Sequence, residues 1–153
     1  TTRQLPLVID PRQPALTLLA RPLEADGRSL PLLGAVAPLP PGQTGVWVSE
    51  PASAIHGWQP GQTITLPLPG ATDARFMVRG IWRDYARQFG AVAIDAADYQ
   101  RLTGDARVND LALWLAPGAA PAAASSHFSS VVQSASMSIG LAMKSSMPAA
   151  LQA

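Results

Sequence analysis

The chain has 153 residues, of which 48% are hydrophobic and 14% charged, with a formal net charge of +1 and no cysteine. A chain this apolar and this weakly charged is predicted to fold around a packed core, which excludes intrinsic disorder. The balance of basic and acidic residues argues against a nucleic-acid binder, and the missing cysteines exclude disulfides and cysteine-ligated zinc.

The first third is predicted to be extended. Prolines crowd residues 5 to 43, which excludes a long helix and favours short strands. The best strand is Ala15 to Arg21, where one set of side chains (Leu16, Leu18 and Ala20) alternates with another (Thr17, Leu19 and Arg21). Leu5 to Ile9 is a weaker candidate. Residues 37 to 42 are predicted to form a stiff loop.

Turn and capping signals become regular after Gly45. Val46 to Val48 is predicted to be a strand, and Ser49 is the predicted N-cap of a short helix with proline in its first turn. The helix is expected to end at Gly57, and His56 is expected in its last turn. A strand from Thr63 to Leu68 follows a proline-glycine turn.

That turn is predicted to be of type II, with Gly61 at its third position, where φ is positive. A side chain at position 61 then costs roughly 1–2 kcal/mol, so Gly61→Val should lower thermal stability. Gly70 is expected in a looser loop, where a substitution should matter less.

The middle of the chain is predicted to continue in short strands. Arg75 to Trp82 forms the second half of a hairpin with both faces partly buried, and Gly90 to Ile94 is another strand. Residues 95 to 104 form a helix, from an N-cap aspartate to a C-terminal glycine, that turns Tyr99 inward. Asp110 to Leu115 is the next strand.

The final third changes character. Residues 111 to 143 carry no charged side chain, but their prolines and serines exclude a membrane span. Apolar side chains recur there at helical spacing, at Phe128, Val131, Val132, Ala135 and Ile139. Residues 137 to 143 also alternate, so they fit a strand as well as a helix. We favour a strand, helix, strand order.

These elements predict an α+β fold in which a β-rich lobe of short strands and hairpins joins a smaller βαβ lobe. Residues 1–42 contribute extended, proline-rich strands to the lobes, and residues 43–106 form the β-rich lobe with two short helices. Residues 107–153 form the βαβ lobe. Neither end shows a targeting signal, so we expect any such signal outside this sequence.

Several segments together resemble a known family. Residues 46–52 read V-W-V-S-E-P-A and are followed by G-W-Q-P-G-Q-T-I-T-L at 57–66. This order resembles the "V-x-V-S-E-x-x-A … G-x-x-x-G-D-x-x-x-L" pattern of FtsX/MacB-like ABC-transporter permeases, with Gln62 in place of the usual acidic residue. The segment F-M-V-R-G-I-W-R-D-Y at 76–85 resembles the family's next strand. The similarity covers residues 45–118 well and 14–34 loosely.

The resemblance implies a place and a set of partners. In that family the domain lies between two transmembrane helices, on the periplasmic side of the inner membrane, and has no catalytic centre. The implied partners are the transmembrane helices of the same permease chain, a separate cytoplasmic ATPase subunit that holds the nucleotide, and a periplasmic protein or an exported lipid, lipoprotein or peptide. The resemblance further implies that the domain relays ATP-driven motion, and that a span of about 20 residues lies on each side of it.

The residues themselves indicate no catalytic, cofactor or metal site. His56 and His127 have no acidic cluster beside them, and the turn at Ser49 lacks the small residues that expose a nucleophile. His56 is expected to interact as a cation with the end of its helix, and Trp47, Trp58 and Trp114 are expected in packing.

One polar group remains a candidate for partner contact: Trp82, Arg83, Asp84 and Tyr85, at the end of an apolar strand. A local ion pair and a tyrosine hydrogen bond would equally account for these residues. Two other functions stay open on the sequence alone, a stand-alone β-rich binding or adhesion module and a hydrolase with a serine centre that no motif reveals.

Overall fold

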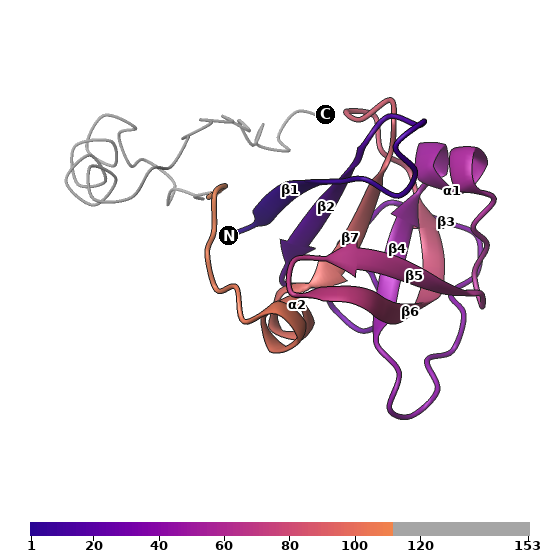
Figure 1. Ribbon diagram of the computed structural model, residues 1–153. Helices are drawn as coiled ribbons and strands as arrows, with labels where there is room; N and C mark the ends of the chain where they lie inside the picture. The colour runs from indigo at the N-terminus through magenta and orange to yellow at the C-terminus, as the bar shows by residue number, and fades with distance from the viewer. Residues whose placement is uncertain (112–153) are drawn as a thin grey trace, which may run out of the picture. The chain divides into compact units, whose positions relative to one another are not determined.

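In the computed structural model, which describes residues 1–111, the strands form one mixed seven-stranded sheet accompanied by two short helices (Figure 1). The elements in chain order are β1 (Arg3–Leu7), β2 (Leu16–Arg21), β3 (Leu32–Leu33), β4 (Gly45–Ser49), α1 (Glu50–His56), β5 (Thr63–Leu68), β6 (Ala71–Trp82), β7 (Ala91–Asp95) and α2 (Ala96–Thr103). The α+β class predicted from the sequence is confirmed. Within the described part, neither helix is long and apolar enough to cross a membrane.

The strand order of the sheet is β1-β2-β7-β4-β6-β3, and β5 pairs with β6 beside this path. The pairs β2–β7 and β4–β6 are parallel, and the remaining pairs are antiparallel. Residues 1–42 therefore share one sheet with residues 43–106, because β2 pairs directly with β7. Thr1–Asn109 form one compact unit that contains every element named above. The predicted strand 110–115 and the predicted βαβ lobe lie almost wholly outside the described residues.

Most predicted elements are present with shifted ends. β1 ends at Leu7, two residues before the predicted end, because the Asp10 carboxylate accepts the Arg12 N–H at 2.9 Å and the chain turns there. β6 begins at Ala71, four residues before the predicted start, and forms the predicted hairpin with β5. The two-residue strand β3 was not predicted. Both predicted helices are confirmed, with left-handed glycines at 57 and 104.

The centre of the sheet is buried on both faces, as the burial of β4 and β7 along nearly their whole length shows. On one face Ala52 of α1 and Tyr99 of α2 pack into a cluster with the strand residues, so the two helices cover that face. On the other face Trp47, Trp82 and Leu19 pack with Leu30, and Val36 lies against them. The second face is thus covered by residues 22–44, a segment that is irregular except for the two-residue strand β3.

Arg79 fixes that segment to the sheet. A bulge in the β4–β6 pairing leaves Arg79 unpaired between Val78 and Gly80. Its guanidinium lies 5.5 Å from the centre of the Trp47 ring, and its Nε donates to the Ala37 carbonyl at 2.6 Å. A cation on an aromatic face and a charge-assisted hydrogen bond are both favourable. Trp47, predicted in packing, is 4% exposed.

Candidate functional site

Three chain connections meet at one end of the sheet. The strand pairing shows which strand ends lie there. Thr17, near the start of β2, pairs with Ala91 at the start of β7, and Ser49 at the end of β4 pairs with Trp82 at the end of β6. The connections are residues 8–15, helix α1 with residues 57–62, and residues 83–90. We call residues 8–15, α1 and residues 83–90 the loop end.

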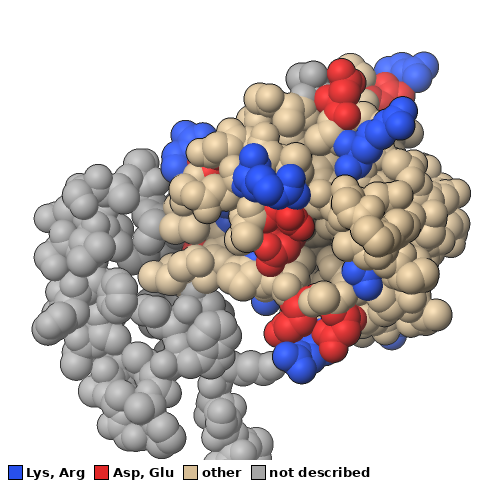
Figure 2. All heavy atoms as spheres, turned by 90° about the horizontal axis from the view of Figure 1, so that it is seen from below, with Lys and Arg blue, Asp and Glu red and all other residues tan. Residues whose placement is uncertain are grey.

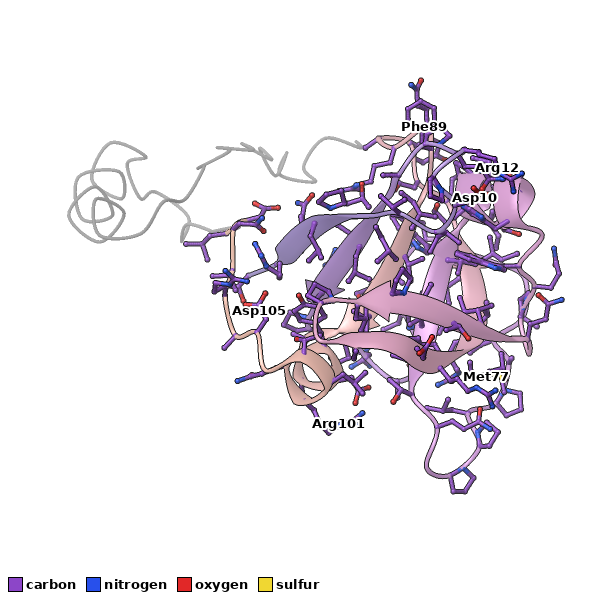
Figure 3. All side chains as sticks on the ribbon, in the orientation of Figure 1. Asp10, Arg12, Met77, Phe89, Arg101 and Asp105 are labelled. Carbon is purple, nitrogen blue, oxygen red and sulfur yellow. The ribbon has the colours of Figure 1, made fainter. Side chains whose placement is uncertain are left out.

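The loop end is tied together by close backbone contacts. The Gly90 carbonyl accepts the Thr17 N–H at 3.1 Å. A Cβ placed on Gly90, whose φ is +87°, would lie 2.5 Å from the backbone nitrogen of Ala52 in α1. Only glycine allows this approach. Figure 3 shows Phe89, Asp10 and Arg12 at this end, and Arg101 and Asp105 away from it.

Ser49 joins the same parts through its hydroxyl. Its Oγ accepts the N–H of Ala52 at 3.3 Å, as the predicted N-cap of α1, and the N–H of Ala91 at 2.7 Å. The side chain is fully buried. Because the hydroxyl is shielded from solvent and already occupied as an acceptor, Ser49 fits an anchor for backbone N–H groups and not a nucleophile.

The predicted contact residues follow β6 into the third connection. Trp82 is 6% exposed and belongs to the core, whereas Tyr85 is 86% exposed. The Arg83 Nε lies 3.7 Å from the Glu50 carboxylate of α1. A hydrogen bond to Tyr85, together with the charge of Glu50, raises the pKa of Arg83, so its guanidinium stays charged. The structure therefore places Arg83 and Tyr85 at the surface and Trp82 beneath it.

Asp84 shapes that connection from inside. Its carboxylate is 3% exposed, accepts the Ala86 N–H at 3.0 Å and pairs with the Arg87 guanidinium at 3.1 Å. The Arg87 carbonyl in turn accepts the Gly90 N–H at 3.0 Å. These bonds are local, as an aspartate-initiated turn requires. Asp84 consequently holds the loop in one shape.

His56 lies in the last turn of α1, as predicted, but not as a cation. Its ring stacks on Trp58 with centroids 4.5 Å apart, and its Nε2 is buried without a hydrogen-bond partner. Burial lowers the pKa of His56, and the nearby Asp10 charge opposes this effect only in part. The imidazole is therefore neutral at pH 7, and the expected attraction between a charged histidine and the helix dipole is wrong. His127 and Trp114 lie outside the described residues.

A second polar cluster surrounds Asp105, away from the loop end. Its carboxylate accepts hydrogen bonds from Arg107 at 2.7 Å, from Arg3 at 3.2 Å and from the Tyr99 hydroxyl at 3.2 Å. These bonds, above all those from Arg107, hold the pKa of Asp105 well below its usual range. A carboxylate so fully paired and so acidic is a poor general base. It joins β1, α2 and the segment after α2, next to an open hollow lined by Pro69, Gly70 and residues 103–107.

The other charged side chains of the described residues form neither a metal site nor a continuous basic surface. Among residues 1–111, no group of three or more His, Asp or Glu side chains could hold a metal ion. On the face seen in Figure 2, basic side chains lie beside acidic ones and form no continuous basic field.

Sequence reasoning missed Phe89, Ile55 and Val8 at the loop end, which are 44%, 41% and 50% exposed. The available signal was an apolar side chain beside turn residues, such as Phe89 before Gly90. That signal alone does not distinguish a surface residue from one that caps the core.

Comparisons with known proteins give one informative result. No protein-family model matches the chain, and no curated protein matches it. Among solved structures, the periplasmic region of MacB from Actinobacillus actinomycetemcomitans matches with a TM-score of 0.53 and 16% sequence identity over 88% of this chain. This chain spans 64% of the length of that structure. The chain therefore shares the fold of part of the periplasmic region of MacB, in agreement with the family that its motifs indicated.

Proposed function

We propose that this chain is the non-catalytic extracytoplasmic domain of an ABC-transporter permease. The observation that carries the proposal is the fold shared with the MacB periplasmic region. The ordered motifs at residues 46–66 and 76–85 support it independently, because they resemble the same family in sequence. The domain then lies on the periplasmic side of the inner membrane, and the ATP site belongs to a separate cytoplasmic subunit.

The chemistry of the described residues supports a mechanical role. Ser49 is buried as a cap and Asp105 is saturated by donors, so neither carries a reaction. Strands β4, β6 and β7 run side by side at the centre of the sheet, and β4 and β7 are buried along most of their length. Packed strands transmit a displacement because such interiors are hardly compressible. Motion of the transmembrane helices of the same chain would thus reach the loop end.

At the loop end, Arg83 and Tyr85 are the proposed contact residues, and Asp84 and Trp82 support them from beneath the surface. Tyrosine and arginine are enriched where proteins bind partners most strongly. Tyr85 offers an exposed ring, and Arg83 offers a guanidinium that stays charged. The partner is a periplasmic protein or an exported molecule.

The location can be tested with single cysteines, because the chain has none of its own. In the full-length protein, freed of other cysteines and expressed in intact cells, Arg101→Cys should react with a membrane-impermeant maleimide before the inner membrane is opened. The Arg101 side chain is 58% exposed. Ala93→Cys is the matched control, because Ala93 is fully buried and should not react. Labelling of position 101 only after the inner membrane is opened would contradict the extracytoplasmic location.

The relay can be tested with the same Arg101→Cys protein, reconstituted in vesicles with its ATPase. A fluorophore at position 101 should change its quenching by headgroup-labelled lipids when ATP is hydrolysed. A hydrolysis-defective ATPase is the control. If ATP turnover leaves the quenching unchanged while the location is confirmed, the domain does not relay motion. A domain that is extracytoplasmic but does not associate with membranes or an ATPase would instead favour a stand-alone binding module.

A further inference from the structure

Two stacked rings fold the chain back on itself at the end of α1. His56, the last residue of α1, stacks on Trp58 with ring centroids 4.5 Å apart and ring planes 19° apart. Between the two rings, the Gly57 N–H donates to the Ser53 carbonyl at 2.8 Å and ends the helix. The Ser53 hydroxyl donates to the Trp58 carbonyl at 2.7 Å. We call residues 53–58 the latch.

The latch lies between two fixed points. On one side, Ser49 caps α1 and bonds to the start of β7. On the other side, the Gly61 N–H donates to the Val78 carbonyl of β6 at 2.8 Å. Trp58 is only partly buried where it packs against the core cluster. The latch can therefore open as a small local unit while the sheet stays folded.

The closed latch has no acceptor for a charged imidazole. The Nε2 of His56 is buried without a hydrogen-bond partner. A neutral nitrogen in such a place costs a moderate amount, whereas a charged N–H without an acceptor costs more, because its charge is also removed from water. The Oε1 of Gln13 is buried and unpartnered as well, so it does not serve as that acceptor. Protonation of His56 thus conflicts with the closed arrangement.

One charge opposes this conflict. Asp10, on the connection 8–15, favours the imidazolium, but its effect on His56 is smaller than that of burial. The Asp10 carboxylate is engaged by Arg12, whose Nε and Nη2 donate to it at 3.1 and 2.9 Å. Residues 57–62 contain no charged side chain. The remaining charges of α1 and of residues 83–90 form the pairs Glu50–Arg83 and Asp84–Arg87.

We propose that the His56–Trp58 stack is an acid-sensitive latch, which neutral His56 holds closed on the end of α1 and which protonation of the imidazole opens. The imidazolium regains in the open form the hydration that the closed form denies to Nε2. Histidine suits such a role because it titrates between pH 5 and pH 8. The chemistry rests on these residues alone. Only the place where acid reaches the latch, outside the inner membrane, rests on the proposed function.

The direction of the pH effect follows from the buried nitrogen. Burial lowers the pKa of His56 from its usual value of 6.5, so the closed latch is fully stable above pH 6.5 and loses stability as the pH falls toward the folded-state pKa. If the open form has the usual pKa, a change from pH 7 to pH 5 favours opening by at most about 25-fold. That limit applies to a closed form that takes up no proton. We expect a change of at least about threefold.

Amide hydrogen exchange measures the opening. In the whole chain, followed by NMR, the protection factor of the Gly57 N–H should fall by about three- to 25-fold from pH 7 to pH 5. Gly104 is the matched control, because it ends α2 with the same left-handed conformation and its N–H donates to the Gln100 carbonyl at 2.8 Å. Its protection factor should change less than twofold. Equal falls at both glycines would indicate general loosening in acid and would overturn the proposal.

Replacing the histidine separates the latch from other effects of acid. His56→Phe keeps a ring that can stack but cannot take up a proton, so the protection of Gly57 should change less than twofold over the same pH range. This variant also identifies the NMR signal of the His56 ring, because His127 is the one other histidine of the chain. In the parent chain that signal should titrate below pH 6.5.

Three results of these measurements would refute the latch. They are a His56 ring that titrates at or above pH 6.5, a fall in Gly57 protection that persists in His56→Phe, and a Gly57 protection that stays constant while His56 titrates. Asp10→Asn adds a check on the charges: it should move the titration of His56 to lower pH, and an unchanged or raised midpoint would contradict the role given to Asp10. These outcomes are separate from those of maleimide labelling and ATP-dependent quenching, which report on location and relay.

Discussion

Removing one hydroxyl should destabilise the fold more than any surface change, because Ser49 serves two backbone N–H groups. Ser49→Ala removes the N-cap of α1, which costs about 0.5–2 kcal/mol. It also leaves the Ala91 N–H unpaired in a fully buried place, which costs about 1–3 kcal/mol. Both hydrogen bonds are present in the structure, at 3.3 and 2.7 Å. We expect a total loss of about 1.5–5 kcal/mol.

The assay is urea unfolding of the isolated chain, followed by fluorescence and circular dichroism. Ser49→Ala should lower the midpoint and leave the slope unchanged, as for a native-state defect. In a thermal melt the same loss corresponds to a drop of roughly 6–20 °C, at about 4 °C per kcal/mol for a unit of this size. Ser49→Gly should be about as damaging. Water replaces the lost acceptor at an exposed N-cap after glycine substitution, but it cannot enter this buried position.

Asp95→Ala is the matched control, because Asp95 caps α2 in the same way. Its carboxylate accepts the Ala97 N–H at 2.9 Å and the Leu23 N–H at 3.1 Å, but the first of these bonds is exposed. Water can take over part of the lost bonding, so we expect a cost of only about 1 kcal/mol. If Ser49→Ala costs no more than Asp95→Ala, then burial does not amplify the loss and the reasoning is wrong.

Three further predictions follow from the same structure. Gly90→Ala should lower the melting temperature more than Gly61→Val. Both glycines have positive φ, but a Cβ at Gly90 would lie 2.5 Å from a backbone atom, whereas Gly61 faces open space. Gly70 also has positive φ, so a substitution there should cost about as much as one at Gly61. Asp105→Asn should remove part of the loss of stability that urea unfolding shows between pH 4 and pH 2. Because the pKa of Asp105 is lowered by folding, its stabilisation is present above the usual value of 3.8 and is lost as the pH falls toward the folded-state pKa. The same pH dependence in Asp105→Asn and the parent chain would contradict the stabilising role of this carboxylate. Calorimetric titration of the whole chain should detect no saturable binding of ATP-magnesium or zinc at micromolar concentration, and such binding would contradict a non-catalytic role.

The helix caps and the turn before β5 were predicted well from the sequence. Ser49 and Asp95 both precede helices that end at left-handed glycines, and all four features are present. These signals depend on contacts within a few residues, which a sequence displays directly. The type II turn is similar: Gly61 has a φ of +88°, and the Gln62 N–H bonds to the Gln59 carbonyl at 3.1 Å.

The order of the strands could not be predicted in the same way. β7 lies between β2 and β4, so neighbours in the sheet are separated in the chain by other elements. The second bonds of the two caps show the same limit, because Ser49 reaches Ala91 42 residues away and Asp95 reaches Leu23 72 residues away. Alternation of apolar residues identifies a strand but does not identify its partner.

The candidate site illustrates why exposure is the hardest property to predict. Trp82 and Tyr85 are three residues apart and both aromatic, yet one is 6% and the other 86% exposed. Trp82 is buried because Leu32 pairs with it and the Arg83 N–H bonds to the Pro31 carbonyl at 2.9 Å, which brings the irregular segment over that face. Nothing in the local sequence around Trp82 reveals that contact. The two residues therefore call for different experiments: a substitution at Trp82 removes core packing and perturbs folding, whereas a substitution at Tyr85 leaves the core intact and reports on binding.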